Sequence, residues 1–440
     1  MSKIYILNQF VKTVPLNKKF ILLYNPLVQN MVVIDRQELI LFNNGFIKKN
    51  DKYNELIKNE ILQDINTDNI KYFNKRKCKI INAKNPGIHV MYLVLNSFCN
   101  LNCNYCFVKK NFNNTSLTKS QIEKALLLFK NQKSPLKKRI ILYGGEPLLN
   151  FTLLEFTLRR IKDIFNEDAK ITLITNGINL NNSNFSLLKE YNVSVGLSLD
   201  GFGEKYNKNR VDLNNKCAYI QIKKTYDFLI SKKYPFGISC TISEDNVADI
   251  KKFVKKLNPR VSSFSYNLLL RSKLKYPENF VNNLFDVLDI LSKNKITEDR
   301  IYSRRVLSLV KNNYYIKDCA GLGNQIVVAK NGNIGICHGY NWNHEVYFPH
   351  NIDTINANYD FSKDYVWNIW NKRSTLNMPC CINCVGLTLC GGGCAANKTE
   401  GELLNIYTLD SVNCLIYKRI ITTLLKKIGL KMIKDKKYID

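Results

Sequence analysis

Three cysteines within eight residues, Cys99, Cys103 and Cys106, constrain this chain more than any other feature. Their spacing, three residues and then two, places three thiolates on one short loop. Four thiolates would close a cubane iron–sulfur cluster or a tetrahedral zinc site, so three leave one iron of a cluster without a protein ligand. Structural zinc sites usually take cysteines as CxxC pairs. The triplet therefore predicts an iron–sulfur site with one open iron, and a zinc knuckle is the alternative.

The cysteine count points to metal binding rather than to disulfides. The chain has 440 residues and 14 cysteines, and all but Cys78, Cys217 and Cys240 fall into spaced groups. Its first residues lack the long apolar stretch of a signal peptide, and no apolar run reaches the about 18–20 residues of a membrane span. We therefore expect a cytoplasmic protein, in which disulfides are rare.

The net charge of +29, from 65 Lys and Arg against 36 Asp and Glu, has two explanations. A basic surface would bind a nucleic acid or an acidic ligand. Alternatively, a lysine-rich proteome scatters basic residues over solvated helix faces. The basic residues run through the whole chain, and the longest cluster, Lys431 to Lys437, reads as a frayed C-terminus. The second explanation is therefore favoured.

From residue 88 onward, apolar runs alternate with amphipathic stretches. Six runs read as strands: Ile88–Leu95, Arg139–Tyr143, Lys170–Thr175, Val193–Leu199, Pro235–Ile242 and Ser262–Leu270. Five stretches have helical periodicity: Ser120–Phe129, Leu153–Ile164, Ser186–Tyr191, Ala218–Ile230 and Val247–Leu257. A closed eight-fold barrel takes about 250 residues, whereas residues 88 to 270 are only 183. The sequence therefore predicts an α/β fold, a partial (β/α)6 barrel of parallel strands.

Glycine, cysteine and polar clusters follow the first four predicted strands. They are the cysteine triplet, Gly144–Pro147, Thr175–Gly177 and Ser198–Gly201. In barrels of this class the active site lies at the carboxyl ends of the strands. We therefore expect one catalytic mouth at that rim.

Within the rim, each element has an expected role. Gly144 and Gly145 would let the backbone approach a ligand closely, and Glu146 would fix the following turn. Ser198 and Arg210, twelve residues apart, would meet on one ligand carboxylate, where Arg210 gives a bidentate clamp.

Cysteines return after a helical connector, which is predicted at Asn279–Leu291 and Ile301–Leu309. They are Cys319, Cys337, Cys381, Cys384, Cys390, Cys394 and Cys414. Seven thiolates exceed the need of one tetrahedral site, and the run Gly391–Gly393 lets the backbone fold tightly. A second metal-rich region is expected, with a zinc ribbon as the alternative.

Residues 88 to about 300 resemble a radical S-adenosylmethionine (SAM) enzyme. Cys99, Cys103, Tyr105 and Cys106 match its CxxxCxΦC signature, and Gly144–Pro147 match its GGEP motif. The resemblance implies a [4Fe–4S] cluster on the three thiolates, whose fourth iron binds SAM. It implies that Tyr105, Gly144, Gly145 and Glu146 contribute to the SAM site, and that Ser198 and Arg210 hold the SAM ribose or carboxylate. Cleavage of SAM to a 5′-deoxyadenosyl radical would then abstract a substrate hydrogen.

The C-terminal cysteines resemble, spacing for spacing, the seven-cysteine SPASM domain. The resemblance implies an outer auxiliary [4Fe–4S] cluster on Cys381, Cys384, Cys390 and Cys414, and an inner one on Cys319, Cys337 and Cys394. Three clusters would then be present. The inner cluster would keep an open iron for a substrate thiolate, unless Cys380 is its fourth ligand. His338 stands where sulfatase-maturing relatives usually have an aspartate, and we expect it to pack near the cluster.

The N-terminal residues 1–86 read as a small separate domain. Strands are predicted at Phe20–Tyr24 and Met31–Asp35, and helical spacing at Leu39–Phe42 and Tyr53–Ile61. This order resembles the winged-helix-like modules with which peptide-modifying enzymes recognise a precursor. A domain that shields one end of the barrel is the alternative. The expected division is therefore 1–86, a barrel at 87–300, a connector at 301–317 and a SPASM domain at 318–440.

These features favour a radical SAM peptide maturase. It would abstract a hydrogen from a ribosomally made precursor and install a cross-link, with a cysteine thioether favoured and a carbon–carbon bond left open. The runner-up is the formylglycine-forming maturation of sulfatases. From another class, a zinc-stabilised, basic nucleic-acid-binding protein would explain the charge but not the GGEP motif.

The expected partners follow from the favoured function. They are a precursor peptide or protein and an electron donor such as flavodoxin or ferredoxin. A nucleic acid is disfavoured, and no membrane is expected. No catalytic base is identified by pattern.

Overall fold

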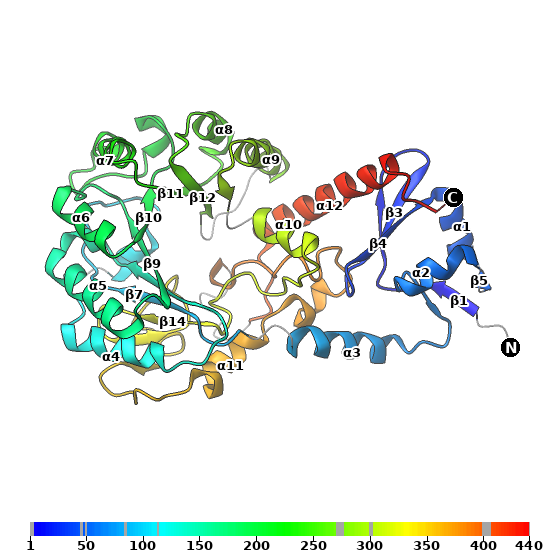
Figure 1. Ribbon diagram of the computed structural model, residues 1–440, viewed down its shortest axis with the longest axis horizontal. Coiled ribbons are helices and arrows are strands. Elements are labelled where there is room, and N and C mark those ends of the chain that lie inside the picture. Colours follow the sequence, from blue (N-terminus) through cyan, green and yellow to red (C-terminus); the bar gives the residue numbers. More distant parts are fainter. Residues whose placement is uncertain are drawn as a thin grey trace.

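The computed structural model describes residues 4–44, 47–48, 51–82, 86–111, 114–269, 277–298, 302–397 and 406–439. A barrel lies at the left of Figure 1 and a smaller N-terminal lobe at the right, with the cysteine-rich segment between them. Leu270 and Ile301, at the ends of two predicted elements, lie outside the described residues. Within these ranges, no helix has both the length and the apolar character needed to cross a membrane.

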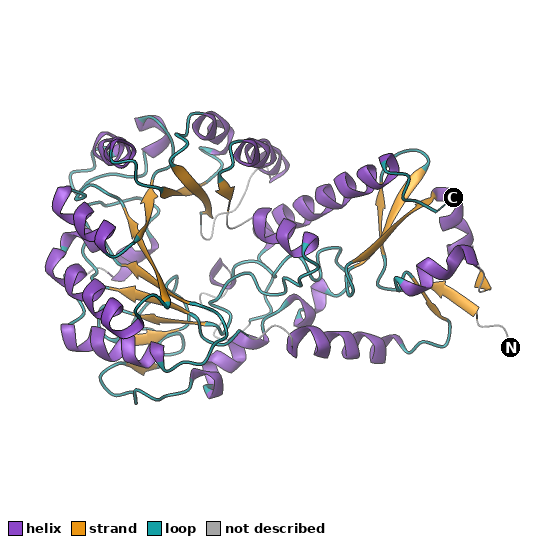
Figure 2. Cartoon of the chain, in the orientation of Figure 1, coloured by secondary structure: helices purple, strands orange, loops and turns teal. Residues whose placement is uncertain are grey.

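Six parallel strands form the barrel, and they neighbour one another in chain order. They are β7 (Val90–Val94), β8 (Lys138–Tyr143), β9 (Ala169–Thr175), β10 (Ser194–Ser198), β11 (Phe236–Ile242) and β12 (Val261–Leu268). The helices that follow them are α4 (Lys119–Lys130), α5 (Phe151–Phe165), α6 (Asn182–Glu190), α7 (Tyr219–Ser231), α8 (Val247–Lys255) and α9 (Pro277–Lys293). Figure 2 shows these helices on the outer side of the strands. The predicted partial (β/α)6 barrel is confirmed.

Buried and half-buried residues alternate along β11, as expected for a strand with helices on one side and the barrel interior on the other. Phe236, Ile238, Cys240 and Ile242 are buried, and the residues between them are only half-buried. Because successive side chains of a strand point to opposite faces, the apolar set packs under the helices. The other set, Gly237, Ser239 and Thr241, faces the barrel interior. This wall of the interior is therefore small and polar.

The barrel sheet continues into the cysteine-rich segment. Strand β14 (Gln325–Val328) pairs in parallel with β7, and β15 (Asn333–Gly335) and β16 (His350–Asn351) follow it antiparallel. With β13 (Thr297–Glu298) at the other end, the described sheet has ten strands. The sequence did not predict this continuation. It brings Cys337, just after β15, beside the first barrel strand.

The N-terminal lobe holds two three-stranded sheets, not one strand pair. The first has the order β5 (Ile47–Lys48), β1 (Ile4–Leu7) and β6 (Leu62–Asp64), and the second β2 (Lys12–Pro15), β3 (Phe20–Asn25) and β4 (Asn30–Asp35). Its helices are α1 (Arg36–Asn44), α2 (Asn54–Lys58) and α3 (Asn69–Asn82). The two predicted strands and two helical stretches are present as β3, β4, α1 and α2. The remaining strands and α3 were missed.

The last helix, α12 (Ser411–Lys434), joins the cysteine-rich segment to the N-terminal lobe (Figure 1). Its residues Ile421, Leu424 and Leu425 share an apolar core with β2, β3 and β4. Beyond it, Ile439 donates its N–H to the Val33 carbonyl at 2.9 Å, so the chain end joins the edge of β4. The expectation of a frayed C-terminus is therefore wrong, because the basic cluster sits on and just after an anchored helix.

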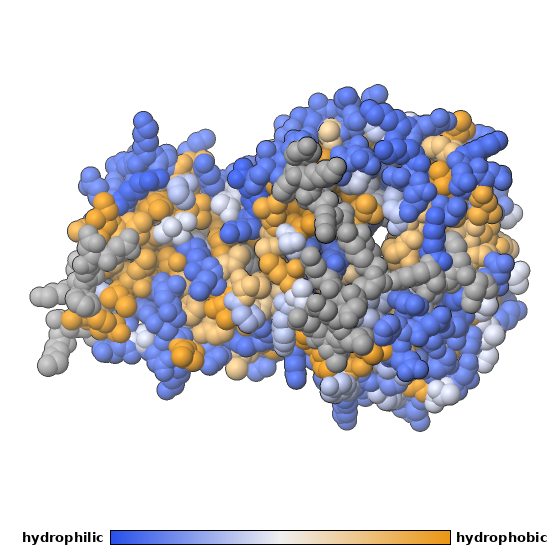
Figure 3. Space-filling model, turned by 180° about the vertical axis from the view of Figure 1, so that it is seen from behind, coloured by the Kyte–Doolittle hydropathy of each residue, from blue (hydrophilic) through white to orange (hydrophobic). Residues whose placement is uncertain are grey.

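Two further helices, α10 (Tyr302–Val310) and α11 (Tyr365–Lys372), flank the cysteine-rich segment. Seen from behind, apolar residues gather over the N-terminal lobe at the left of Figure 3, while hydrophilic residues cover much of the barrel. Ile40, Leu41 and Ile70 are among the exposed apolar residues of that lobe.

Candidate functional site

The cysteine triplet lies on the loop that leaves β7 at the barrel rim. Two backbone hydrogen bonds hold the loop. Asn102 N–H donates to the Val211 carbonyl at 2.7 Å, and Asn104 N–H donates to the Asn209 carbonyl at 2.9 Å. These bonds join the loop to the segment that contains Arg210. The three thiols are close enough for their charges to interact.

Burial controls the ionisation of these thiols. It raises the pKa of Cys99 to about 12, with a further contribution from Glu146, and it raises the pKa of Cys103 and Cys106 above the ordinary value. A buried thiol becomes a thiolate when a cation is bound beside it. The three half-buried thiols are donors of the type that iron takes, and their role as cluster ligands stays a prediction.

The GGEP segment lies directly against the residues that precede the triplet. Gly145 N–H bonds the Asn96 carbonyl at 3.0 Å, and Glu146 N–H bonds the Phe98 carbonyl at 2.9 Å. A Cβ on Gly145 would lie 2.0 Å from the Phe98 oxygen, and one on Gly144 would lie 2.7 Å from the Asn96 oxygen. The close approach that the structure shows for both glycines is to the chain itself, where the sequence interpretation had a ligand.

Glu146 connects two rim motifs. Its carboxylate accepts bonds from the Leu148 N–H at 3.0 Å, the Thr175 hydroxyl at 2.7 Å and the Asn176 N–H at 2.7 Å. Burial raises its pKa to about 7, and these bonds only partly offset that effect. Asn176 in turn places its amide 3.7 Å from the Cys99 sulfur. The second and third motifs thus meet the triplet, as expected.

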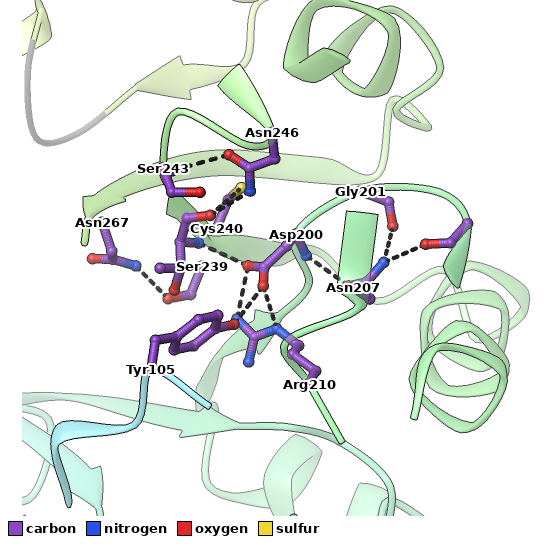
Figure 4. Close-up of polar contacts among 12 residues, drawn as sticks. Tyr105, Asp200, Gly201, Asn207, Arg210, Ser239, Cys240, Ser243, Asn246 and Asn267 are labelled. Atoms are coloured by element: carbon purple, nitrogen blue, oxygen red, sulfur yellow. Dashed lines mark hydrogen bonds and ion pairs between the residues drawn. The ribbon is translucent and has the colours of Figure 1, made fainter. Parts of the chain in front are cut away.

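The fourth motif meets the triplet through Asp200, which the sequence interpretation did not single out (Figure 4). Asp200 is 2% exposed and accepts two bonds of 2.9 Å from the Arg210 guanidinium. It also accepts bonds from the Tyr105 hydroxyl and, at 2.8 Å, from the Thr241 N–H. Sequence spacing could not reveal this contact, since Tyr105 lies far away along the chain.

Ser198 and Arg210, both described residues, are not joined by a hydrogen bond, and their expected shared role on a ligand carboxylate stays a prediction. Ser198 lies in register with Ser239 of β11. Burial by itself would lower the pKa of Arg210, but the Asp200 carboxylate more than offsets this and the pKa is raised. The Arg210 guanidinium, which was expected to bind a ligand carboxylate, therefore already donates two bonds to the Asp200 carboxylate.

The eight cysteines from Cys319 to Cys414 fall into two groups within which the thiol charges interact. Cys394 interacts with Cys319 and Cys337. Cys381 interacts with Cys380, Cys384 and Cys390, and Cys414 with Cys380 and Cys384. The two sets match those that the SPASM resemblance implied except for Cys380, and their role as cluster ligands stays a prediction. Among the described residues, no three His, Cys, Asp or Glu side chains converge closely enough to hold one metal ion.

Cys380 lies with the outer group. Its sulfur is 3.9 Å from that of Cys381, whereas the sequence interpretation offered it to the inner group. Burial raises the pKa of Cys390 to about 12 and that of Cys394 well above the ordinary value. These two cysteines, like the triplet, are half-buried.

An aromatic cluster separates the triplet from the inner cysteine group. His338, next to Cys337, stacks on Tyr92 of β7 with ring centroids 4.2 Å apart. Tyr143 of β8 and Phe107, next to Cys106, complete the cluster at 5.2 and 5.8 Å. His338 thus packs between the two cysteine sites, as expected.

Arg305 was missed because nothing marks it in the predicted connector helix. Its side chain is fully buried, bonds Asp318 at 2.7 Å and the Cys390 carbonyl at 2.8 Å, and lies 3.6 Å from the ring centroid of Tyr417. Asp318 precedes Cys319, so Arg305 ties together segments that carry ligands of both proposed auxiliary sites.

A cavity of about 420 Å³ lies in the N-terminal lobe between β6 and α3. Among the described strands, β6 lies at the edge of its sheet. The backbone groups of Leu62 point away from β1, because the neighbouring residues make the pairing bonds. Gln63 is 8% exposed, and its Oε1 has no hydrogen-bond partner among the described residues. Lys75 and Lys79 line the cavity without an ion pair to any described residue.

Comparison with known proteins gives a family match and several relatives. The model of the Radical SAM superfamily matches residues 93–257. The uncharacterised protein MJ0907 of Methanocaldococcus jannaschii is 30% identical over 57% of this chain and 85% of its own length. The radical SAM cyclopropyl synthase TigE of Paramaledivibacter caminithermalis is 23% identical over 97% of both chains. A cysteine-type anaerobic sulfatase-maturating enzyme of Clostridium novyi is 27% identical over 73% of this chain and 91% of its own.

Solved structures share the fold. The chain superposes on anSMEcpe with bound AdoMet with a TM-score of 0.63 and 20% identity, over 78% of this chain and 99% of that one. It superposes on Streptococcus suis SuiB bound to the precursor peptide SuiA with a TM-score of 0.51 and 16% identity, over 93% and 99%. The second similarity covers the N-terminal lobe as well as the barrel and the cysteine-rich segment.

Proposed function

Because this chain belongs to the radical SAM superfamily, we propose that it is a peptide maturase that installs a cysteine thioether cross-link in a ribosomally made precursor. The observation that carries this is the presence of two further thiol groups on a segment whose strands extend the barrel sheet. Solved structures of the same fold are seen with peptides: SuiB with its precursor peptide SuiA, and anSMEcpe with the Cp18Cys peptide.

The residues at the barrel rim suit the family's cofactors. Cys99, Cys103 and Cys106 would hold a [4Fe–4S] cluster, and the Glu146 segment and Arg210 would line the SAM site. When bound, cluster and SAM supply a 5′-deoxyadenosyl radical for hydrogen abstraction. The chain's own part is to orient the ligands and exclude water, which the buried contacts of Glu146 and Asp200 favour.

The other thiol groups would hold auxiliary clusters. Cys381, Cys384, Cys390 and Cys414 form the outer site and Cys319, Cys337 and Cys394 the inner one. Three thiol ligands leave the inner site able to bind a substrate thiolate, which supports a thioether product. A reduced flavodoxin or ferredoxin would supply electrons, and the net charge of +29 favours such acidic proteins.

The test is a reaction of anaerobically reconstituted protein with SAM and a cysteine-containing precursor peptide. The thioether function predicts a product lighter by two hydrogens, with loss of one free thiol. A peptide with a sulfatase motif distinguishes thioether formation from the alternative function, sulfatase maturation, because only formylglycine formation gives an aldehyde. Cys337→Ala should abolish cross-linking but retain SAM cleavage, and Cys78→Ala, at an exposed cysteine outside the groups, is the control. A precursor whose mass never changes would refute the proposal.

The cavity beside β6 would receive the precursor as an added strand. The free backbone groups of Leu62 and the unpaired Gln63 oxygen suit peptide amides, and Lys75 and Lys79 suit acidic side chains. Lys75→Glu with Lys79→Glu should weaken precursor binding by about tenfold or more, measured by fluorescence anisotropy. Lys77→Glu, on the same helix but outside the cavity lining, should bind like the unaltered protein.

A further inference from the structure

We propose that Asp200 is a positioning residue that couples the cysteine loop to Arg210, so that SAM binding depends on a contact between Asp200 and Tyr105; this rests on the SAM-dependent function proposed above. Both carboxylate oxygens are fully used (Figure 4). Oδ2 accepts from Arg210 Nε at 2.9 Å and from the Tyr105 hydroxyl, and Oδ1 accepts from Arg210 Nη2 at 2.9 Å and the Thr241 N–H at 2.8 Å.

Asp200 is itself held rigidly. Its N–H donates to Asn207 Oδ1 at 3.0 Å, and the Asn207 amide donates to the carbonyls of Gly201 and Gly203, both at 2.8 Å. The Thr241 N–H comes from the end of the neighbouring strand β11. Asp200 is therefore fixed by two strands before any ligand arrives.

The ion pair sets the charge that a ligand would meet. Arg210 is 6% exposed, and a buried cation without a partner is strongly unfavourable. Paired with Asp200, it is part of a neutral unit. SAM carries an ammonium and a sulfonium against one carboxylate, so a neutral unit accepts this cation where a bare arginine would repel it. A guanidinium has five N–H groups, and the two bonds to Asp200 leave the others for a ligand carboxylate.

The contact with Tyr105 brings in the cysteine loop. Tyr105 stands between Cys103 and Cys106, and its ring centroid lies 5.5 Å from the Arg210 guanidinium. A shift of the loop therefore moves the hydroxyl that shares Oδ2 with Arg210 Nε. Through Asp200, the placement of the thiols and the placement of the arginine become one mechanical unit.

The experiment measures SAM affinity of anaerobically reconstituted protein by equilibrium dialysis with labelled SAM, alongside iron content and thermal midpoint. Tyr105→Phe keeps the ring and removes only the hydroxyl, so we expect about threefold weaker SAM binding with unchanged iron. Asp200→Asn should weaken binding tenfold or more, because its amide cannot accept both Arg210 bonds. Asp245→Asn, at an exposed ion pair with Lys208 on the same rim, is the matched control.

Coupling is the decisive result. Tyr105→Phe should have no further effect on SAM affinity in the Asp200→Asn background. The same loss in both backgrounds, or wild-type affinity in either single variant, would overturn the proposal. If Asp200→Asn loses iron or fails to fold, Asp200→Glu takes its place. The effect of Tyr105→Phe on SAM affinity is then compared between the unaltered and the Asp200→Glu backgrounds. A protein that binds SAM in this pattern but leaves every precursor unchanged would remove the peptide function and keep the role of Asp200.

Discussion

At the scale of single residues, the rim depends on backbone segments that approach too closely for any side chain. Gly145 lies where a Cβ would come within 2.0 Å of the Phe98 carbonyl oxygen, because these two residues approach each other through their backbones. Neither can move without displacing the loop that carries the triplet. The GGEP glycines are therefore required by the fold of the site even before a ligand is considered.

Gly145→Ala should accordingly destabilise the barrel by about 3 kcal/mol, the upper range for overpacking. For a domain of this size that is roughly a 6–12 °C fall in the thermal midpoint. Calorimetry of the variant would show it, together with a loss of iron from the reconstituted protein. Gly339→Ala is the control for the thermal midpoint only, because its added Cβ meets nothing closer than 3.4 Å but lies 3.6 Å from the Cys337 sulfur. An unchanged midpoint in Gly145→Ala would contradict the close packing.

Lys138 gives a pH dependence of stability. Burial lowers the pKa of its amine to about 8, although it donates to the Gln132 and Ile88 carbonyls at 2.6 and 2.8 Å. The unfolded chain, with a pKa near the usual ~10.4, binds more protons between these values. This group therefore makes the free energy of unfolding rise as pH increases from 8 to 10.

Lys138→Met removes this contribution. The thermal midpoint of the unaltered protein minus that of the variant should increase from pH 8 to pH 10. A series of melts in matched buffers measures this difference. Lys137→Met, at an exposed neighbour, should follow the unaltered protein. A constant difference between Lys138→Met and the unaltered protein across that range would show that the amine stays charged.

At the scale of elements, α12 is the support of the N-terminal lobe. Leu425 is fully buried against β2, β3 and β4, and Gly429 lies so close to Leu16 that a Cβ would meet it at 2.7 Å. The lobe therefore has no complete core without the last helix of the chain.

Leu425→Ala should cost about 2–5 kcal/mol of local stability. Because the core is shared, the N-terminal strands should become sensitive to limited proteolysis while the barrel stays resistant. Mass spectrometry of the fragments would locate the cuts, and Lys426→Ala, on the exposed face of the same helix, is the control. Cuts confined to the barrel would contradict the support role of α12.

The same scale shows what sequence could predict. The six barrel repeats were found because strand and helix periodicities are local. The residues of β11, for example, alternate between buried apolar and half-buried small or polar residues. The pairing of β14 with β7 was missed because Val90 and Gln325 are 235 positions apart, and four buried residues in a row carry no sign of their partner. Asp200 was missed for the same reason: its role is defined by Tyr105 and Thr241, which come from other elements.

At the scale of the whole molecule, the thiols form three groups along one continuous framework. A [4Fe–4S] cluster in each would give about twelve irons. Cys99→Ala should lose about four of these and all SAM cleavage, and Cys384→Ala should lose about four while keeping cleavage. Iron and sulfide analysis with a 5′-deoxyadenosine assay on the same sample measures both. Loss of all iron in either variant would show that the groups do not fill independently.

The long-range pairing of β14 also has a consequence for how the protein is made. The edge of β7 stays open from its synthesis until residue 325 has left the ribosome, 235 residues later. At the usual 5–20 residues per second this is roughly 10–50 s. During that time a bare strand beside the cysteine triplet is available to other nascent chains. This edge is therefore open to incorrect pairing while the chain is being made.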